Sequence, residues 1–459
     1  MKLGSKDINT YLHNNGSAMG IPKSLQRVLP ACFALFMIFW FLSSNSDQVN
    51  EVSQRVFAHR NTLFPRKVWQ TWKVDPLDFE QRDLDTARSW PAKNPSYRYE
   101  VLTDQNDLAW VETHFGPEGF NRLDIVYIYR ELTLRIIKAD LLRYLVMYVE
   151  GGLYTDIDVE ALRPITDFVP ERFDERDVDM VVGVEIDQPE FAQHPILGQK
   201  CQSFCQWTFM CKPHLPVMME LVESIMLWLK GIAAEQNKPI SEIELDFDQV
   251  IAGTGPSAFT KAILAHMSER AGKTITWSMF HGIGESKLVG GVLVLTVEAF
   301  AAGQGHSDSG THDTKHALVR HHYHASKWPD KHPRYKHPVY AEVELCNWVQ
   351  DCVDRWDENT ANFAKMTPEE QQGLIDTHNK EEAERIEREQ KEEAEKKERE
   401  EKEEKEKKER EDREAKENWD KAHPPAAPEG GAAPPASGDA PPAAPGPEIA
   451  AAAVMPAWP

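Results

Sequence analysis

Residues 139–158 constrain the fold of this chain more than any other stretch. Apolar residues recur at helical spacing as far as Val149, and two glycines, Gly151 and Gly152, then interrupt the helix. A short apolar segment follows and ends in two carboxylates, Asp156 and Asp158. The stretch therefore predicts a helix, a tight turn and a short strand that carries an acidic pair at its end. Two such aspartates can hold a hard divalent cation, and the cation can neutralise a diphosphate.

The pattern Asp-X-Asp alone is weak support for a metal site, because the chain contains it four times, at 83/85, 156/158, 177/179 and 246/248. Only the pair at 156/158 follows a Gly-Gly turn and a helix on which Asp140 and Arg143, three residues apart, share one face. A turn-forming acidic pair is the alternative interpretation.

The length of the chain, its net charge and its hydrophobic periodicity limit the possible fold classes. Residues 60 to 355 suit one large α/β domain, and the formal net charge of −22 argues against a nucleic-acid partner. A diphosphate substrate would then need a local metal and local Arg or Lys. Alternating strands and helices predict a mainly parallel central sheet with sites at its strand ends. The expected strands are 68–72, 97–102, 180–184 and 289–297, and the expected helices are 79–90, 104–115, 130–149, 215–230 and 256–271.

The amino-terminal region predicts a membrane anchor. Residues 28–42 are apolar and bulky, the weakly polar Ser43 and Ser44 extend the segment to 44, and Lys23 and Arg27 precede it. We expect an uncleaved signal anchor there, with residues 1–27 in the cytosol and a lumenal stem at 45–64. A cleaved signal peptide is the alternative, but the segment before the apolar run is long and no Ala-X-Ala site follows it. The catalytic domain is expected at 65–355.

The carboxyl-terminal region changes composition. After a connector at 356–379, residues 380–421 contain 20 acidic and 15 basic residues and no apolar heptad seam, so they predict a lone solvated helix or a disordered segment. Residues 422–459 are rich in Pro and Ala and predict a disordered tail. Five cysteines follow the membrane segment, at 201, 205, 211, 346 and 352. The number is odd, so at least one thiol stays free or pairs between chains.

The stretch that ends at Asp158 resembles the donor-site signature of glycosyltransferase family 32, and within it the fungal initiating α-1,6-mannosyltransferases of the Golgi. Five further segments match in the family's order and extend the resemblance over roughly residues 60 to 350. They are Lys-Val-Trp-Gln-Thr-Trp at 67–72, Asn-Pro-Ser-Tyr at 94–97 with Leu-Thr-Asp at 102–104, Phe-Cys-Gln-Trp-Thr-Phe at 204–209, Gly-Thr-Gly-Pro at 253–256 and His-His-Tyr-His-Ala-Ser-Lys-Trp at 321–328.

The resemblance implies a GT-A-like nucleotide-sugar-binding fold and a metal-dependent mannosyltransferase. It implies GDP-mannose as donor, a divalent metal, with manganese expected, and transfer to an N-glycan core on a glycoprotein with retention of configuration. The expected location is the Golgi membrane, single-pass type II with a lumenal catalytic domain, where the chain could join a mannosyltransferase complex. A same-family enzyme acting on a sphingolipid acceptor and a catalytically silent subunit of a Golgi complex are the alternatives.

The resemblance also assigns the metal site. Asp158 is expected to bind the metal directly, and Asp156 to hold the ribose and the water shell of the metal, so that both serve catalysis. Alignment on Ala325 and Ser326 selects His321 as the third ligand, and the clustered histidines leave His322 as the alternative. Lys327 splits the family's Ser-Trp pair, and Ala325 stands where Gly is common, so the details of the phosphate-side loop are open.

Further residues are expected to bind the donor. Asp140, Arg143 and Tyr144 would contact the sugar and phosphate, although an intrahelical ion pair is the alternative for the first two. Trp69 would stack on the base, with core packing as its alternative, and Gln70 would hydrogen-bond the base. By resemblance alone, Trp207 and Gly255-Pro256 would shape the acceptor side.

Overall fold

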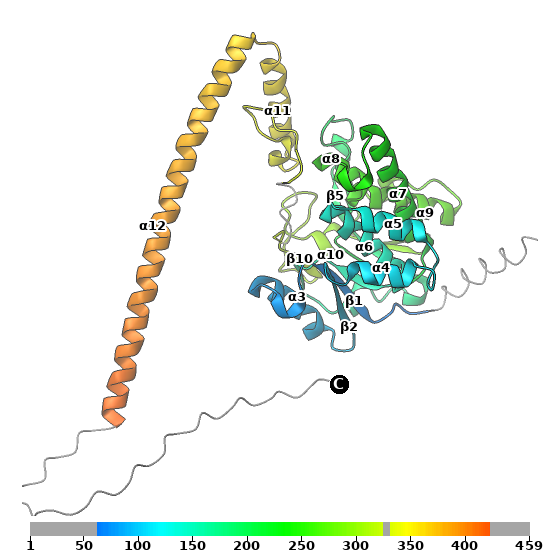
Figure 1. Cartoon of the computed structure of the whole chain (residues 1–459), viewed down its shortest axis with the longest axis horizontal. Helices are drawn as coiled ribbons and strands as arrows, with labels where there is room; N and C mark the ends of the chain where they lie inside the picture. Colours follow the sequence, from blue (N-terminus) through cyan, green and yellow to red (C-terminus); the bar gives the residue numbers. More distant parts are fainter. Residues whose placement is uncertain (1–61, 325–330, 423–459) are drawn as a thin grey trace, which may run out of the picture. The chain divides into compact units, whose positions relative to one another are not determined.

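The computed structural model describes residues 62–324 and 331–422 (Figure 1). The predicted anchor at 28–44, most of the stem and the tail from residue 423 lie outside the described residues, as do Ala325, Ser326 and Lys327. Within these ranges, every helix is too short or too polar to cross a membrane. The chain divides into two compact units after Gln371.

The first unit is a mixed α/β domain. Its strands are β1 (Lys67–Trp72), β2 (Arg98–Thr103), β3 (Gly152–Thr155), β4 (Val159–Ala161), β5 (Met180–Asp187), β6 (Gln202–Phe204), β7 (Thr208–Cys211), β8 (Lys287–Val289), β9 (Val292–Leu295) and β10 (Val319–His321). Its helices are α3 (Gln81–Lys93), α4 (Asp107–Phe115), α5 (Leu123–Glu131), α6 (Arg135–Val149), α7 (Pro216–Gln236), α8 (Phe247–Gly253), α9 (Pro256–Ala271), α10 (Val297–Ala301) and α11 (Gln350–Phe363).

The central sheet has the strand order β2-β1-β3-β7-β5-β9-β8, and β6 pairs with β5. Strand β1 is parallel to β2 and β3, and β5 is parallel to β9, whereas β7 and β8 run against their neighbours. Strands β2, β1, β3, β5 and β9 therefore point the same way, which confirms the predicted mainly parallel sheet. A second sheet pairs β10 with β4 in antiparallel fashion.

The Gly-Gly turn forms as predicted. Gly151 and Gly152 follow α6 with φ angles of 60° and 95°, which favour glycine. A Cβ atom at Gly152 would lie 2.6 Å from the carbonyl oxygen of Lys67, so a side chain there would collide with β1. The turn thus directs the chain into β3, beside β1.

Several predicted elements have wrong boundaries: α7, for example, ends at Gln236 and not at 230. Two of the differences have a visible local cause. The helix expected at 130–149 begins only at Arg135, because Leu132 and Leu134 adopt extended backbone conformations and separate α5 from α6. The extended backbone lets the Leu132 side chain be buried. The strand expected at 289–297 is instead the hairpin β8–β9 and the start of α10, since Gly290 and Gly291 turn the chain with φ angles of 58° and 85°.

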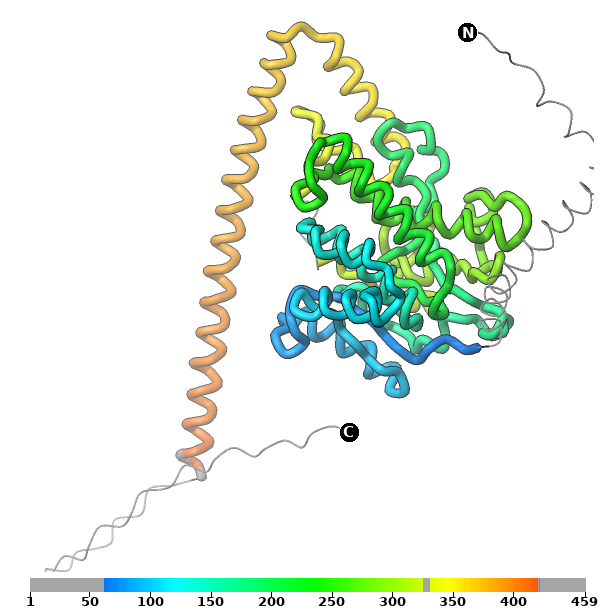
Figure 2. The backbone as a smooth tube through the Cα atoms, turned by 45° about the vertical axis from the view of Figure 1, so that its right-hand side comes forward, coloured from blue at the N-terminus to red at the C-terminus, as the bar shows by residue number. Residues whose placement is uncertain are grey.

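The core lies between the sheet and its helices. Helix α7 contacts both α6 and α9, and the tube in Figure 2 shows these helices packed together beside the strands. The rings of Tyr144 on α6 and Phe259 on α9 stack at 5.8 Å, and Phe209 on β7 lies 4.9 Å from Phe259. All three rings are fully buried, and each contributes about 1.5–3 kcal/mol by leaving water. This packing fixes α6, which carries the predicted donor-site residues.

The five cysteines that the structure describes form one disulfide and three free thiols. Cys346 and Cys352 form a disulfide at the start of α11, with their Cα atoms 5.4 Å apart. Cys201, Cys205 and Cys211 are free and buried. Burial raises the pKa of the Cys205 and Cys211 thiols, so they behave as inert core residues.

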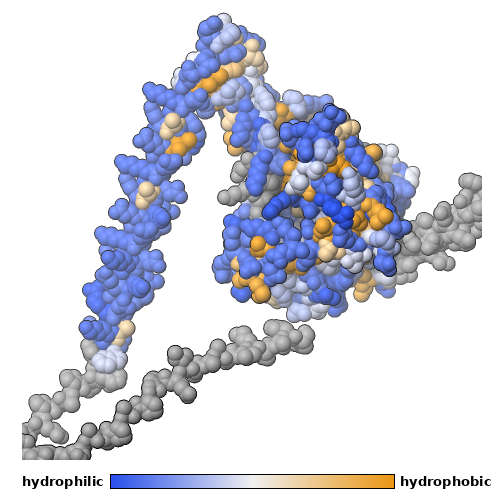
Figure 3. Space-filling view, in the orientation of Figure 1, coloured by the Kyte–Doolittle hydropathy of each residue, from blue (hydrophilic) through white to orange (hydrophobic). Residues whose placement is uncertain are grey.

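The second unit contains most of α12 (Pro368–Ala422), a single helix 55 residues long. Its surface is almost entirely hydrophilic (Figure 3). Ion pairs one turn apart join Lys396 to Glu400 and Lys397 to Glu401 at 3.7 and 3.9 Å. Such exposed pairs contribute only a few tenths of a kcal/mol each, so α12 depends on many of them together.

Candidate functional site

The acidic pair lies on the short connection between β3 and β4. The backbone N–H of Asp156 donates to the carbonyl oxygen of Trp207 at 2.8 Å, and the N–H of Val159 donates back to the carbonyl of Asp156 at 3.1 Å. The Asp156 side chain is 26% exposed, whereas that of Asp158 is 4% exposed. The connection is therefore rigid, and it presents both carboxylates at the end of a sheet strand.

Asp156 is held by two neighbours. Its Oδ1 accepts a hydrogen bond from the Tyr154 hydroxyl at 2.8 Å and lies 3.3 Å from Nη2 of Arg143. Burial raises the pKa of Asp156, the positive charge of Arg143 opposes that rise, and the nearby Asp158 adds to it. The carboxylate of Asp156, the more exposed of the pair, is thus fixed in direction, and one of its faces remains accessible.

Asp140 and Arg143 form a buried layer behind Asp156. Arg143 is 4% exposed and Asp140 is 1% exposed, and Nη2 of Arg143 lies 3.2 Å from Oδ1 of Asp140. Nη1 of Arg143 donates to the carbonyl oxygen of Gln206 at 3.1 Å, and the Thr254 hydroxyl donates to Asp140 at 2.7 Å. Burial raises the pKa of Asp140 to about 6 despite its cationic neighbour. Both predicted residues join the site, but beneath its surface.

Gln70 and Tyr144 are completely buried in this structure and use their polar atoms within the protein. The Gln70 amide donates to the carbonyl oxygen of Asp156 at 2.9 Å and accepts from Tyr99. The Tyr144 hydroxyl donates to the carbonyl oxygen of Thr254 at 2.8 Å and to the Gln206 side chain. These two residues therefore support the site from inside.

Trp69 lies on β1, next to Gln70 in the chain, and is 6% exposed. Its indole nitrogen is buried and has no hydrogen-bond partner among the described residues. The ring also belongs to the main hydrophobic core, so core packing accounts for its position.

The second sheet brings the histidine cluster to the acidic pair. Pairing of β10 with β4 sets His321 opposite Val159, and Nε2 of His321 lies 3.3 Å from Oδ1 of Asp158. The next residue, His322, turns away and lies 3.1 Å from Glu160. Of the two candidates that the sequence left open, His321 is the one beside Asp158.

His324, on the loop after β10, contacts Asp83, a residue that the sequence did not single out as part of the site. Nε2 of His324 lies 3.0 Å from Oδ1 of Asp83 on α3, and its backbone N–H donates to Oδ2 of Asp158 at 3.0 Å. Asp83 has no exposed surface. It belongs to another of the four Asp-X-Asp pairs, and no local sequence signal distinguishes its role. The contact ties α3 to the loop that follows β10.

Asp158 and His321 are the residues that could hold a divalent cation. Asp158 supplies a carboxylate and His321 an imidazole whose Nδ1 is buried with no hydrogen-bond partner in the described residues. No group of three or more His, Cys, Asp or Glu suited to a metal occurs within residues 62–324 and 331–422. Cations that act on phosphates commonly take one or two protein ligands and complete their shell with phosphate oxygens and water.

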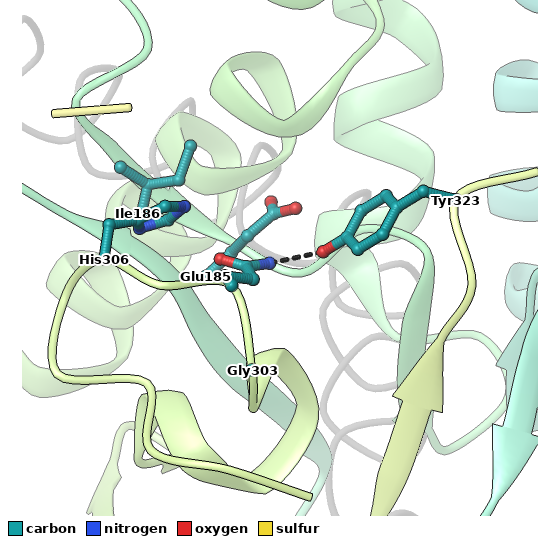
Figure 4. A pocket seen from close by; sticks show the side chains of 6 residues that line it. Glu185, Ile186, Gly303, His306 and Tyr323 are labelled. Atoms are coloured by element: carbon teal, nitrogen blue, oxygen red, sulfur yellow. Dashed lines mark hydrogen bonds between the residues drawn. The ribbon is translucent and has the colours of Figure 1, made fainter. Parts of the chain in front are cut away.

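A pocket of about 420 Å³ opens beside this site, and Figure 4 shows the residues that line it. Glu185, at the end of β5, lines it and accepts from the Trp207 indole at 2.7 Å and from the Ser203 hydroxyl at 3.2 Å. Burial raises the pKa of Glu185, and the bond from Trp207 opposes the rise. Sequence reasoning missed Glu185, because only the fold brings it near the acidic pair.

The region that contains the acidic pair is similar in sequence to known proteins. Residues 80–174 match the family described as glycosyltransferase sugar-binding region containing DXD motif. The chain is 32% identical over 268 residues to the initiation-specific alpha-1,6-mannosyltransferase of Schizosaccharomyces pombe, with 58% of this chain and 64% of that protein covered. The protein of the same name from Candida albicans is 29% identical over 260 residues, with 52% and 65% covered. The chain thus spans less than two thirds of the length of each.

More distant similarities accompany these. Inositol phosphoceramide mannosyltransferase 3 of S. pombe is 26% identical over 151 residues, with 30% of this chain and 38% of that protein covered. Among solved structures, PaToxG glycosyltransferase superposes with a TM-score of 0.31 at 13% identity, covering 51% of this chain and 83% of that one.

Proposed function

The chain carries the sugar-binding region of the DXD-containing glycosyltransferases, as its motifs indicate, and from this premise we propose that it is a retaining α-1,6-mannosyltransferase. Its donor would be GDP-mannose and its acceptor an N-glycan core. The observation that carries the proposal is the position of Asp158 and His321, 3.3 Å apart at the end of β3, with Arg143 fixing Asp156 beside them. The choice of mannose as the sugar and of the α-1,6 linkage rests on the names of the relatives.

Asp158 and His321 would hold the divalent cation, for which we propose manganese. When bound, the cation would offset the charge that grows on the departing diphosphate. Asp156 lies next to this position with one carboxylate face accessible, so it can accept hydrogen bonds from the ribose or from metal-bound water. Its own direction is set by Tyr154 and Arg143, which leaves little reorganisation for the reacting state.

The buried layer behind Asp156 performs a second task. Arg143 neutralises part of the negative charge of Asp140 and Asp156, and it anchors the Gln206 carbonyl next to Trp207. Gln70 fixes the carbonyl of Asp156 from the other side. The layer therefore positions the acidic pair and excludes water beneath it, while the donor binds above.

A sphingolipid acceptor is the second candidate, because an inositol phosphoceramide mannosyltransferase is among the relatives. The stronger similarity to the α-1,6-mannosyltransferases favours the N-glycan acceptor. A catalytically silent role in a Golgi complex is disfavoured, since Arg143 pairs with both Asp140 and Asp156 and Asp158 lies beside His321. We further propose residence in the Golgi membrane through a type II anchor at 28–44.

The experiment that tests the function is a donor screen with purified full-length chain. Nucleotide release is scored from GDP-mannose, other GDP-sugars and UDP-sugars, with a mannan-type oligosaccharide or inositol phosphoceramide as acceptor. We expect manganese-dependent release from GDP-mannose that the oligosaccharide accelerates. Release only from another donor would refute the donor assignment, and acceleration only by the lipid would select the second candidate.

Asp158→Asn tests the assignment of the acidic pair. The change keeps the shape of the side chain and removes the charge that balances a cation. Loss of a comparable electrostatic contact costs about 10²–10³ in rate, so turnover should fall at least that far. The rise in melting temperature on adding manganese with GDP should also disappear. Asp85→Asn, at an exposed carboxylate of another Asp-X-Asp pair, is the matched control. Near-parental turnover in Asp158→Asn would show that the pair is not the catalytic centre.

A further inference from the structure

The pocket beside the acidic pair has no role in the function proposed so far. Six residues line it, and they come from the end of β5, from the segment after α10 and from the loop after β10: Glu185, Ile186, Gly303, Gln304, His306 and Tyr323. In Figure 4 the Glu185 carboxylate and the Tyr323 ring approach each other across this space. Its volume of about 420 Å³ is sufficient for one or two sugar rings.

Two aromatic contacts join this pocket to the catalytic site. The Tyr323 ring stacks on the His321 ring with centroids 3.8 Å apart, and the centroid of the Trp207 ring lies 4.4 Å from that of His321. Trp207 donates from its indole to Glu185, and its backbone carbonyl accepts from the N–H of Asp156. A ligand in the pocket would therefore lie next to the residues that face the donor phosphates.

The lining chemistry excludes a phosphate and suits a neutral polyol. None of the six described residues that line the pocket is Lys or Arg, and Glu185 would repel a diphosphate. The carbonyl oxygen of the Gln304 side chain is buried without a hydrogen-bond partner in the described residues, while its amide donates to the Tyr323 hydroxyl at 2.6 Å. Tyr323 is 58% exposed, so its ring offers an open apolar face.

We propose that this pocket binds the terminal hexose of the acceptor glycan. Glu185 accepts hydrogen bonds from its hydroxyl groups, Gln304 supplies a further acceptor, and Tyr323 packs against the apolar face of the ring. The inference rests on the proposed function. The hexose of the donor is the competing occupant, and the measurements below separate the two.

Glu185→Gln keeps the size of the side chain and removes its charge. We expect the KM for a mannan-type oligosaccharide to rise at least tenfold in the full-length chain. GDP release from GDP-mannose without acceptor should change far less than the acceptor KM, because Glu185 accepts from Ser203 and Trp207 rather than from the side chains that fix Asp156. The thermal shift given by manganese with GDP should also persist. Glu190→Gln, at an exposed carboxylate just beyond β5, is the matched control.

Ile186→Trp is the second variant, since it fills the pocket without changing charge. It should lower transfer to the oligosaccharide at least tenfold, while the thermal shift with manganese and GDP verifies folding. An unchanged acceptor KM in Glu185→Gln would overturn the proposal. A parallel loss of acceptor-free GDP release would also overturn it, because the pocket would then hold the donor hexose.

A binding measurement keeps this inference separate from the proposed function. Methyl α-mannoside is titrated into the full-length chain with GDP and manganese present, and saturation-transfer NMR reports the bound sugar. If the parent binds methyl α-mannoside and Glu185→Gln binds it at least tenfold more weakly, the pocket assignment is supported. This conclusion holds even if no donor is turned over and the proposed function fails. Absence of mannoside binding to the parent, or equal binding to both proteins, would refute the pocket assignment.

Discussion

Asp140 should lower the stability of the folded chain at neutral pH, and Asp140→Asn measures how much. The residue is 1% exposed, and burial raises its pKa from 3.8 to about 6 although Arg143 and Thr254 favour the charged form. One pKa unit corresponds to about 1.4 kcal/mol, so ionisation of Asp140 costs roughly 3 kcal/mol of folding free energy. Asp140 lies directly behind the acidic pair, and we expect a residue that lowers stability in this way to be retained for function.

The sign and the pH window follow from the direction of the shift. The folded state holds the proton of Asp140 more tightly than the unfolded state does. Below about pH 4 both states are protonated, and this residue makes no pH-dependent difference. Between about pH 4 and pH 6 stability falls as pH rises, and above pH 6 the full cost is present. An asparagine cannot ionise, yet its side-chain oxygen can still accept the bond from Thr254.

The assay is urea unfolding of the full-length chain followed by tryptophan fluorescence, at several pH values from 4 to 7. The free energy of unfolding of Asp140→Asn, relative to the parent, should increase by about 3 kcal/mol across this range. Asp85→Asn, at an exposed position on α3, should show no comparable trend. A flat difference, or a parent that gains stability over the variant as pH rises, would mean that Arg143 fully compensates the buried charge. Turnover of Asp140→Asn should fall at every pH, because Arg143 loses one of its anchors.

Two further predictions follow from the buried layer and from α12. Tyr144→Phe should destabilise the fold by about 1–2 kcal/mol, because the hydroxyl loses its bonds to Thr254 and Gln206, while the KM for the donor stays within about threefold. A larger change in donor KM, measured by GDP release, would restore Tyr144 as a donor contact. A chain that ends at Gln371 should keep turnover within about tenfold of the full chain, since α12 beyond that point forms its own exposed unit. A greater loss would assign α12 a catalytic role.

The parts of the fold that depend on local pattern could be predicted from the sequence. Helix α6, the Gly-Gly turn and β3, which ends at Thr155, lie within 21 consecutive residues and are encoded by helical periodicity and by two positive φ angles. The limits of α9 agree with prediction because Pro256 starts the helix and Gly272 ends it in the left-handed conformation. Helix α6 starts later than predicted, because tertiary burial of Leu132 overrides the continuous apolar pattern.

The parts of the site that depend on long-range packing could not be predicted. No motif surrounds Glu185. It reaches the site only because β5 pairs with β7, and Trp207, which directly precedes β7, donates to Glu185. Asp83 is one residue in a repeated acidic pattern, and only the packing of α3 brings it to His324. The choice between His321 and His322 needed the register of β10 on β4.

That pairing of β10 with β4 has a consequence for biosynthesis. Asp158 and the backbone of His324, which hydrogen-bond each other, are 166 residues apart in the chain. At about 5–20 residues per second, the ribosome finishes the acidic pair on the order of ten seconds before it makes the histidines. During that interval Asp158 lacks both the His321 imidazole and the hydrogen bond from the His324 backbone. The nascent chain should therefore acquire affinity for manganese with GDP only after residue 324 has emerged, which delays ligand binding until nearly the whole domain has been made.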